Sequence, residues 1–149
     1  MSDPLYRREL LRLAADAHGA GRLSAPQAQG EAFNPNCGDR IIVTLTLDDH
    51  GHITALGHET RACVLAQASA SILGQAARNL GRDDIRALRD AVTAMLKGEA
   101  PPPGTPFDAY AAFDGVLDYA PRHRCVLLPI EALLKALESD GADPDPESA

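Results

Sequence analysis

The chain has 149 residues, 45% of them hydrophobic. This hydrophobic content is enough for one packed core, and the length is that of a single domain. Its 14 basic and 21 acidic residues give a net charge of −7, and no run of Lys or Arg is long enough to neutralise a row of phosphates, which argues against a nucleic-acid partner. The first residues carry charges where a signal peptide needs an apolar core, and the longest clean apolar run, 125–130, is far too short to span a membrane. We therefore expect a cytoplasmic protein with no membrane association, one domain at 1–138 and a disordered acidic tail at 139–149.

The N-terminal part of the chain predicts a helix and then a loop. Apolar residues recur at helical spacing over 4–17, and Asp3 can cap a helix whose first position is Pro4. Residues 18–36 are rich in Gly, Ala, Pro, Ser and Gln, which have little to bury. This second segment is expected to be a mobile loop.

The next segment predicts antiparallel β-structure. Every second residue from Ile41 to Leu47 is apolar, which is typical of a half-buried strand over 40–48. Residues 48–51 have turn composition, and 52–61 is expected to return as a second strand, with Gly57 as a possible bulge that divides it in two. The prediction is a sheet of two or three strands.

The C-terminal half predicts helices. The stretch that begins at Cys63 is so rich in Ala, Ser and Gly that its helix is expected to be buried against the sheet or another helix. Further helices are expected over about 83–97, over 107–119 as a short helix, and over 122–137. Because proline is accepted only in the first turns of a helix, Pro129 places the start of the last helix close to Cys125. The fold class is therefore α+β, a small antiparallel sheet of two to three strands packed on one face by helices.

Three cysteines and one aspartate stand out as candidates for chemistry. In an extended chain Cys37 and Asp39 point to the same face as Ile41, towards the layer where the helices pack. Cys63 and Cys125 fall where helices are expected to begin, a position that favours a thiolate. An odd number of cysteines in a reducing compartment is not a disulfide framework.

Basic residues reinforce the thiolate character of Cys125. Arg122, His123 and Arg124 immediately precede it, and a nearby cation favours the charged form of a thiol. Three thiolates and one carboxylate suit zinc or an iron-sulfur cluster, and an aspartate is a more readily exchanged ligand than a fourth cysteine. Arg122 is either a solvated charge at a helix start or a residue that steadies the thiolates. A closed structural zinc site or plain core packing of the cysteines is the simpler alternative.

Three stretches resemble one protein family in the family's own order. They are NPNCGDRIIVTLTLD, RACVLAQASAS and RHRCVLLPIEALLKAL, which together span about 34–137. They resemble the iron-sulfur cluster assembly scaffold proteins of the NifU/IscU/SufU type. This resemblance implies the SufE/NifU-like fold and a role in iron-sulfur cluster assembly.

Within that family the sequence is more similar to SufU-like members. Cys63 and Cys125 are 62 positions apart, like the insertion of SufU-type proteins, and Arg124 stands where IscU-type members have histidine. The chain also lacks the Leu-Pro-Pro-Val-Lys stretch of IscU-type scaffolds.

The SufU likeness implies a zinc site and a sulfur donor. Zinc would be held by Cys37, Asp39, Cys63 and Cys125, and Cys37 would accept sulfur from a pyridoxal-phosphate cysteine desulfurase of the SufS-like kind, with Arg122 in a supporting role. Iron-sulfur apoproteins or other scaffold proteins would be the downstream partners. The protein would then be close to a zinc-dependent sulfurtransferase, although its status as an enzyme stays open.

Two alternatives remain. An IscU-like scaffold would bind iron or a nascent [2Fe-2S] cluster with the same four residues, and Cys125 would be its persulfide acceptor. A structural zinc domain would only dock to partners. Among other polar residues, Ser69 and Ser71 lack a Gly-x-Ser-x-Gly motif and are assigned to helix packing, and the histidines 50, 52 and 58 are interpreted as solvated residues of the hairpin rather than ligands.

Overall fold

The computed structural model describes residues 4–35, 38–116 and 120–139. Three strands form one antiparallel sheet in the order β1-β2-β3. In chain order the elements are α1 (Pro4–Asp16), β1 (Ala28–Asn34), β2 (Asp39–Leu47), β3 (Ile53–Arg61), α2 (Val64–Ala76), α3 (Arg82–Leu96), the 3₁₀ helices η1 (Asp108–Val116) and η2 (Ala120–Arg122), and α4 (His123–Ser139). The predicted α+β class and its antiparallel sheet are confirmed.

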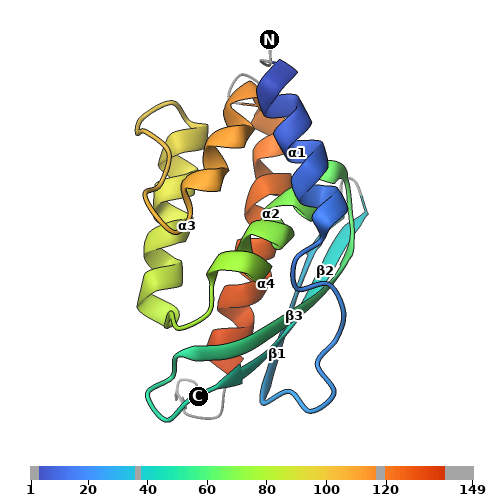
Figure 1. The fold of residues 1–149 in the computed structure, drawn as a ribbon, viewed down its shortest axis with the longest axis vertical. Helices are drawn as coiled ribbons and strands as arrows, with labels where there is room; N and C mark the ends of the chain where they lie inside the picture. The colour runs from blue at the N-terminus through green and yellow to red at the C-terminus, as the bar shows by residue number, and fades with distance from the viewer. Residues whose placement is uncertain (1–3, 36–37, 117–119, 140–149) are drawn as a thin grey trace.

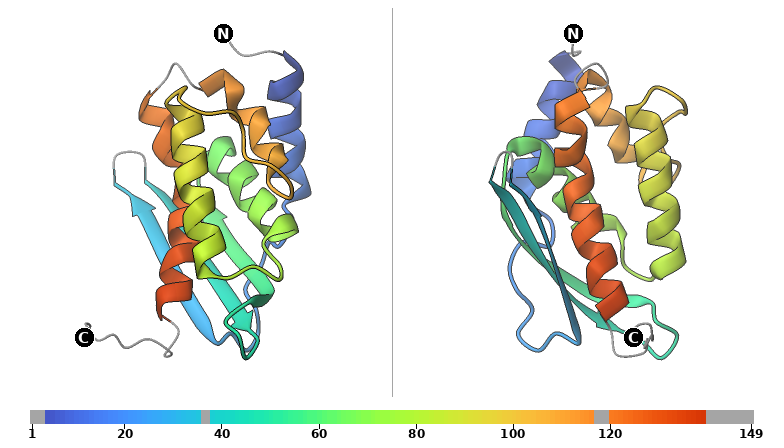
Figure 2. Two further views of the ribbon diagram at one scale, coloured as in Figure 1. Left: turned by 90° about the vertical axis from the view of Figure 1, so that its left-hand side faces the viewer. Right: turned by 180° about the vertical axis from the view of Figure 1, so that it is seen from behind.

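The helices are arranged in two layers above the sheet (Figures 1 and 2). Helix α4 lies along β1 and β2, while α2 contacts β3 and α4. In the outer layer, α1 packs on α2 and η1, and α3 packs on α4 and η1. Residues from the three strands and from all the described helices of more than one turn form the core between these layers. Its largest fully buried side chains include Ile41, Leu45, Ile72, Ile85, Tyr110, Phe113, Leu128 and Leu133.

The sheet shows the alternation expected of a layer with one covered face. In β2 the side chains of Ile41, Val43 and Leu45 are buried among the helices, as the period-two pattern predicts. Thr44, on the opposite parity, is buried as well, because its hydroxyl accepts a hydrogen bond from the Leu23 backbone N–H. The loop after α1 therefore covers part of the outer face.

The prediction of a mobile loop over 18–36 is wrong for its second half. Residues Ala28–Asn34 form β1, in which buried and exposed residues alternate strictly. The inward positions include Ala28, Gly30 and Ala32, which are too small to produce a hydrophobic strand signal. Their small size is what allows α4 to approach the strand.

Most of the predicted helix boundaries agree with the structure within a few residues. The segment 107–119 is a 3₁₀ helix over Asp108–Val116, and 117–119 lie outside the described residues. Helix α4 begins at His123, slightly before the start close to Cys125 that Pro129 predicts. Pro129 itself lies inside the helix. Helix α4 ends at Ser139, and the remainder of the predicted acidic tail, 140–149, lies outside the described residues. None of the helices in the described ranges has the length and apolar character that a bilayer crossing requires.

Gly30 determines how closely α4 approaches the sheet. A Cβ atom at this position would lie 2.3 Å from the Ala132 carbonyl oxygen and 2.3 Å from the Ala136 amide nitrogen, both in the backbone of α4. Backbone atoms cannot rotate away as a flexible side chain can. Any residue other than glycine must therefore displace α4 from β1.

We expect Gly30→Ala to lower the free energy of unfolding by about 1–3 kcal/mol, the usual cost of overpacking a core. Urea denaturation followed by circular dichroism measures this change. Gly104→Ala is the matched control, since a Cβ at Gly104 has no neighbour within 4 Å. Equal stability of the two variants would contradict the close-packing interpretation of β1 and α4.

Candidate metal centre

Three of the four predicted ligands come together where three elements begin. Asp39 is the first residue of β2, Cys63 is the N-cap of α2, and Cys125 lies in the first turn of α4. One carboxylate oxygen of Asp39 and the sulfur atoms of Cys63 and Cys125 all lie within 4.8 Å of one another. The starts of these elements lie near one another at the end of the sheet where β1 ends and β2 begins (Figure 2).

The β1-β2 hairpin places Asp39 in the core. Asn34 and Asp39 form the last cross-strand pair, and the Gly38 amide donates a hydrogen bond of 2.8 Å to the Asn34 carbonyl. Gly38 adopts φ +75°, a conformation that glycine accepts without strain. In the alternation of β2, Asp39 points inwards on the same face as Ile41 and is only 6% exposed.

The carboxylate of Asp39 has an unusual environment. Its Oδ2 atom is buried and has no hydrogen-bond partner among the described residues. A buried carboxylate oxygen without a partner costs free energy unless a cation or donor compensates it. Because an oxygen of this carboxylate also lies within 4.8 Å of two thiol sulfurs, the local chemistry fits a bound metal cation.

The two thiols differ in exposure. Cys125 is 4% exposed, whereas Cys63 is partly exposed. Cys63 occupies the N-cap with an extended backbone, yet its side chain makes no capping hydrogen bond to the helix. Its sulfur therefore remains available for another partner, and the site is accessible from outside at this position.

Cys37 lies outside the described residues, so its role as a ligand stays a prediction. Its position in the chain is two residues before Asp39, in the turn that joins β1 to β2. Arg122 is exposed at the end of η2 and forms no ion pair with another described residue, and its supporting role also stays a prediction.

The donor set can be compared with the demands of possible metals. Two thiols and a carboxylate, with Cys37 as a potential fourth ligand, suit tetrahedral zinc and also the cysteine-rich ligation of iron-sulfur clusters. Magnesium and calcium prefer an all-oxygen shell and fit this set poorly.

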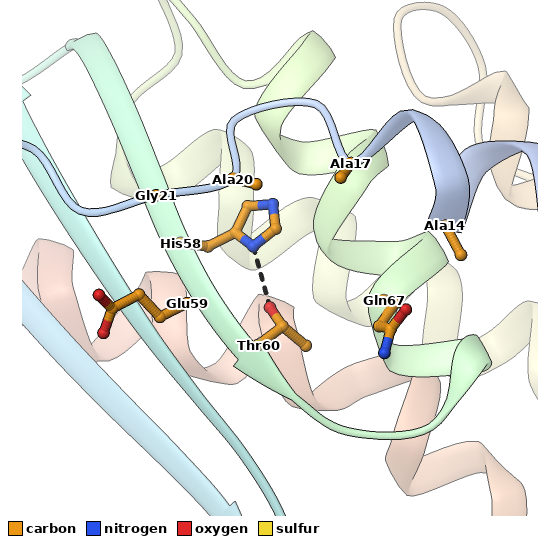
Figure 3. Close-up of a pocket in the computed structure, with 8 residues that line it drawn as sticks. All are labelled: Ala14, Ala17, Ala20, Gly21, His58, Glu59, Thr60 and Gln67. Atoms are coloured by element: carbon orange, nitrogen blue, oxygen red, sulfur yellow. Dashed lines mark hydrogen bonds between the residues drawn. The ribbon is translucent and has the colours of Figure 1, made fainter.

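One of the three hairpin histidines does not behave as predicted. His50 and His52 are exposed, but His58 is 5% exposed, so the prediction that it is solvated is wrong. Its Nδ1 pairs with the Thr60 hydroxyl at 2.9 Å and its Nε2 with the His18 carbonyl at 2.9 Å. Figure 3 shows this ring at the wall of a cavity of about 320 Å³ between α1, β3 and α2. With both nitrogens engaged, His58 serves the structure and is not a ligand.

Sequence reasoning missed Asn34 as a neighbour of the site. It is 4% exposed and directly opposite Asp39 in the sheet. Asn34 falls in the segment predicted to be a mobile loop, and a polar residue before Pro35 gives no sign of burial. A strand at this position would have revealed that Asn34 points inwards.

Comparison with known proteins decides the family. A sequence profile of the NifU-like N-terminal domain matches residues 5–126. The chain belongs to this family. It is similar to the iron-sulfur cluster assembly scaffold protein IscU of Streptococcus pyogenes serotype M1, with 26% identity over 81% of this chain and 75% of that protein. It is also similar to the zinc-dependent sulfurtransferase SufU of Bacillus subtilis strain 168, with 27% identity over 93% and 92%.

Solved structures of NifU-like proteins have the same fold. The NifU-like N-terminal protein of Brucella abortus superposes with a TM-score of 0.86 at 32% identity, over 93% of this chain and 96% of that one. A SUF-system scaffold protein of Fervidobacterium islandicum AW-1 superposes with a TM-score of 0.77 at 20% identity, over 87% and 93%, and supports the fold alone. The predicted resemblance to the family and its fold is confirmed.

Burial of His58 leads to a pH prediction. Desolvation lowers the pKa of His58 below its ordinary 6.5, and the hydrogen bond to the His18 carbonyl opposes this only in part. Below pH 6.5 the unfolded chain binds a proton that the folded chain resists, so stability falls as the pH drops from 6.5 through the lowered folded pKa. We expect His58→Gln to lose less stability than the wild type between about pH 8 and about pH 5, the range in which histidine titrates.

Urea denaturation at several pH values measures this difference. Glutamine keeps an N–H donor for the His18 carbonyl but does not titrate. Parallel pH profiles for the two proteins would contradict the prediction.

The unpartnered oxygen of Asp39 leads to a prediction about metal binding. Zinc in 100-fold excess over its dissociation constant should stabilise the wild type by about 2.7 kcal/mol. Asp39→Ala should reduce this increment, because it removes one candidate ligand. It should change the metal-free protein much less, because it also removes a buried oxygen that lacks a hydrogen-bond partner among the described residues. Thermal unfolding with and without zinc separates the two effects.

Asp83→Ala is the control for Asp39→Ala, because the Asp83 side chain is 96% exposed on α3. It should retain the full zinc increment. An Asp39→Ala protein with the same increment as this control would exclude Asp39 as a ligand.

Proposed function

We propose that this protein is an iron-sulfur cluster assembly protein that holds zinc with Cys37, Asp39, Cys63 and Cys125 and accepts sulfur from a pyridoxal-phosphate cysteine desulfurase. One observation carries the proposal. The Asp39 carboxylate, with its unpartnered buried oxygen, and the Cys63 and Cys125 sulfurs lie within 4.8 Å of one another. This is a zinc-compatible set that lacks one ligand, and Cys37 is the residue in the adjacent turn.

The relatives support this assignment from the sequence side. The Bacillus subtilis protein named a zinc-dependent sulfurtransferase matches along nearly the whole of both chains. The interval between Cys63 and Cys125 holds α2, α3, η1 and η2, and a long interval is what the SufU likeness implies.

The residues of the site would divide the work. Bound zinc would stabilise the thiolate form of its cysteine ligands. Asp39 provides a carboxylate that exchanges more readily than a thiolate, and partly exposed Cys63 marks the side from which a partner reaches the site. Cys37, in the turn between β1 and β2, is the residue we assign as sulfur acceptor.

Sulfur transfer to Cys37 is thiol exchange without net oxidation. The Cys37 thiolate attacks the terminal sulfur of the desulfurase persulfide and forms a new S–S bond. The S–S bond of the donor breaks, and its cysteine leaves as a thiolate. Cys37 then carries the persulfide, which iron-sulfur apoproteins or other scaffold proteins would receive in the cytoplasm.

The IscU-like alternative has its own support. Relatives from Streptococcus pyogenes and Thermotoga maritima are named iron-sulfur cluster assembly scaffold protein IscU, at 26% and 27% identity. In this role the four residues would bind a [2Fe-2S] cluster as cargo. A purely structural zinc domain would hold zinc with the same four residues, so activation of a desulfurase, and not the ligand set, separates it from the proposal.

Metal analysis and a desulfurase assay test the proposal together. Protein from iron-replete cells, purified without oxygen, should contain about one zinc per chain and no visible chromophore, because zinc has a filled d shell. It should accelerate a cysteine desulfurase, and Cys37→Ala should abolish the acceleration. Arg122→Ala should retain zinc and accelerate less.

Other results would reject the proposal. A visible iron-sulfur chromophore with little zinc would favour the scaffold role. Zinc with an unchanged acceleration by Cys37→Ala would remove Cys37 as the acceptor. Zinc without any acceleration would leave the docking domain as the better description.

A further inference from the structure

A buried hydrogen-bond network joins the two helices that carry the cysteines. Ser69 on α2 donates from its hydroxyl to the Val126 carbonyl on α4 at 2.8 Å. The Tyr110 hydroxyl, from η1, lies 2.8 Å from Ser69 Oγ. Ser69, Tyr110 and Val126 are all 0% exposed, so no water competes for these bonds.

The network acts on the turn next to the metal centre. Val126 follows Cys125 directly, and Ser69 lies on the helix that Cys63 caps. The Ser69 to Val126 bond therefore ties the first turn of α4 to α2. Any sliding of one helix along the other changes the separation of the two sulfurs and breaks this bond.

Pro129 explains why this turn benefits from outside support. Proline has no N–H and cannot donate to the carbonyl four residues earlier, which belongs to Cys125. Its ring also crowds this turn of the helix. A side-chain bond from α2 to the next carbonyl, that of Val126, restrains the same turn.

Tyr110 sets the direction of the Ser69 hydroxyl. Complete burial raises the pKa of Tyr110, so the phenol remains protonated and acts as a donor. Ser69 has a single proton, which goes to the Val126 carbonyl, and its oxygen accepts from Tyr110. Tyr110 belongs to the long segment between Cys63 and Cys125, which thus gains a specific structural role.

Simple core filling does not account for this arrangement. Ser71 lies on the same helix and is also 0% exposed, but its hydroxyl accepts from the His18 amide at 3.0 Å, on the side of α1. Two buried serines on one helix thus serve different neighbours. Of these two serines, Ser69 is the one whose hydroxyl bonds to the helix that carries Cys125.

We propose that Ser69 is a positioning residue of the metal centre, which holds Cys63 and Cys125 at ligating separation, and that Tyr110 orients it. This inference rests on the zinc site of the proposed function. Residues behind metal ligands typically contribute about tenfold to about 100-fold in metal affinity. We expect an effect at the lower end, because Ser69 acts through the helix backbone.

The test uses the full chain loaded with zinc or cobalt(II). Ser69→Ala should weaken zinc binding about tenfold in a chelator competition and shift the visible cobalt(II) absorption, which reports ligand geometry. Tyr110→Phe keeps the ring and removes the hydroxyl, and it should shift both readouts in the same direction by less. The double variant should match Ser69→Ala alone, because Tyr110 acts through Ser69.

Ser71→Ala is the matched control and should leave zinc affinity and the cobalt(II) spectrum unchanged. Circular dichroism establishes that each variant is folded, and if Ser69→Ala does not fold, the Tyr110→Phe result decides. The inference is wrong if the folded variants keep the metal affinity and spectrum of the control. A wild-type chain that binds neither zinc nor cobalt(II) would instead reject the proposed function.

Discussion

The close approach of α4 to β1 is the constraint on which the rest of the structure depends. Gly30 leaves no side chain between the strand and the backbone of α4, so the helix can lie along the sheet and bury its apolar face. Cys125 at the start of α4 then meets Asp39 at the start of β2. The packing of small residues in one strand thus sets the geometry of a site built from other elements.

The candidate centre differs from the core in its chemistry but uses the same framework. Its three described candidate ligands lie at or near the start of a strand and two helices, where backbone N–H groups are not all used by secondary structure. The framework beneath is well packed and apolar, while the candidate ligands include a buried carboxylate oxygen with no hydrogen-bond partner in the described part of the chain. Such a contrast between a well-packed support and an unsatisfied site is typical of places where a protein binds something.

Much of this could be predicted from the sequence, and the exceptions have physical reasons. Strand β2 and helix α3 carry clear apolar periodicities, and the NPNCGD motif pointed to Asp39. Strand β1 was missed because its inward residues, Ala28, Gly30 and Ala32, are small. They pack against α4 through their small size and produce no hydrophobic strand pattern. His58 was misjudged because its burial depends on the chain near His18, which no local pattern reveals.

The distances of the ligands along the chain have a consequence for folding. Asp39 and Cys63 are 24 positions apart, and Cys63 and Cys125 are 62 apart, so a cation bound by all three would close two long loops. The entropy of loop closure is lost before such contacts form, and an unfolded chain keeps only Cys37 and Asp39 close together. Metal binding of the proposed kind would therefore require the assembled tertiary structure.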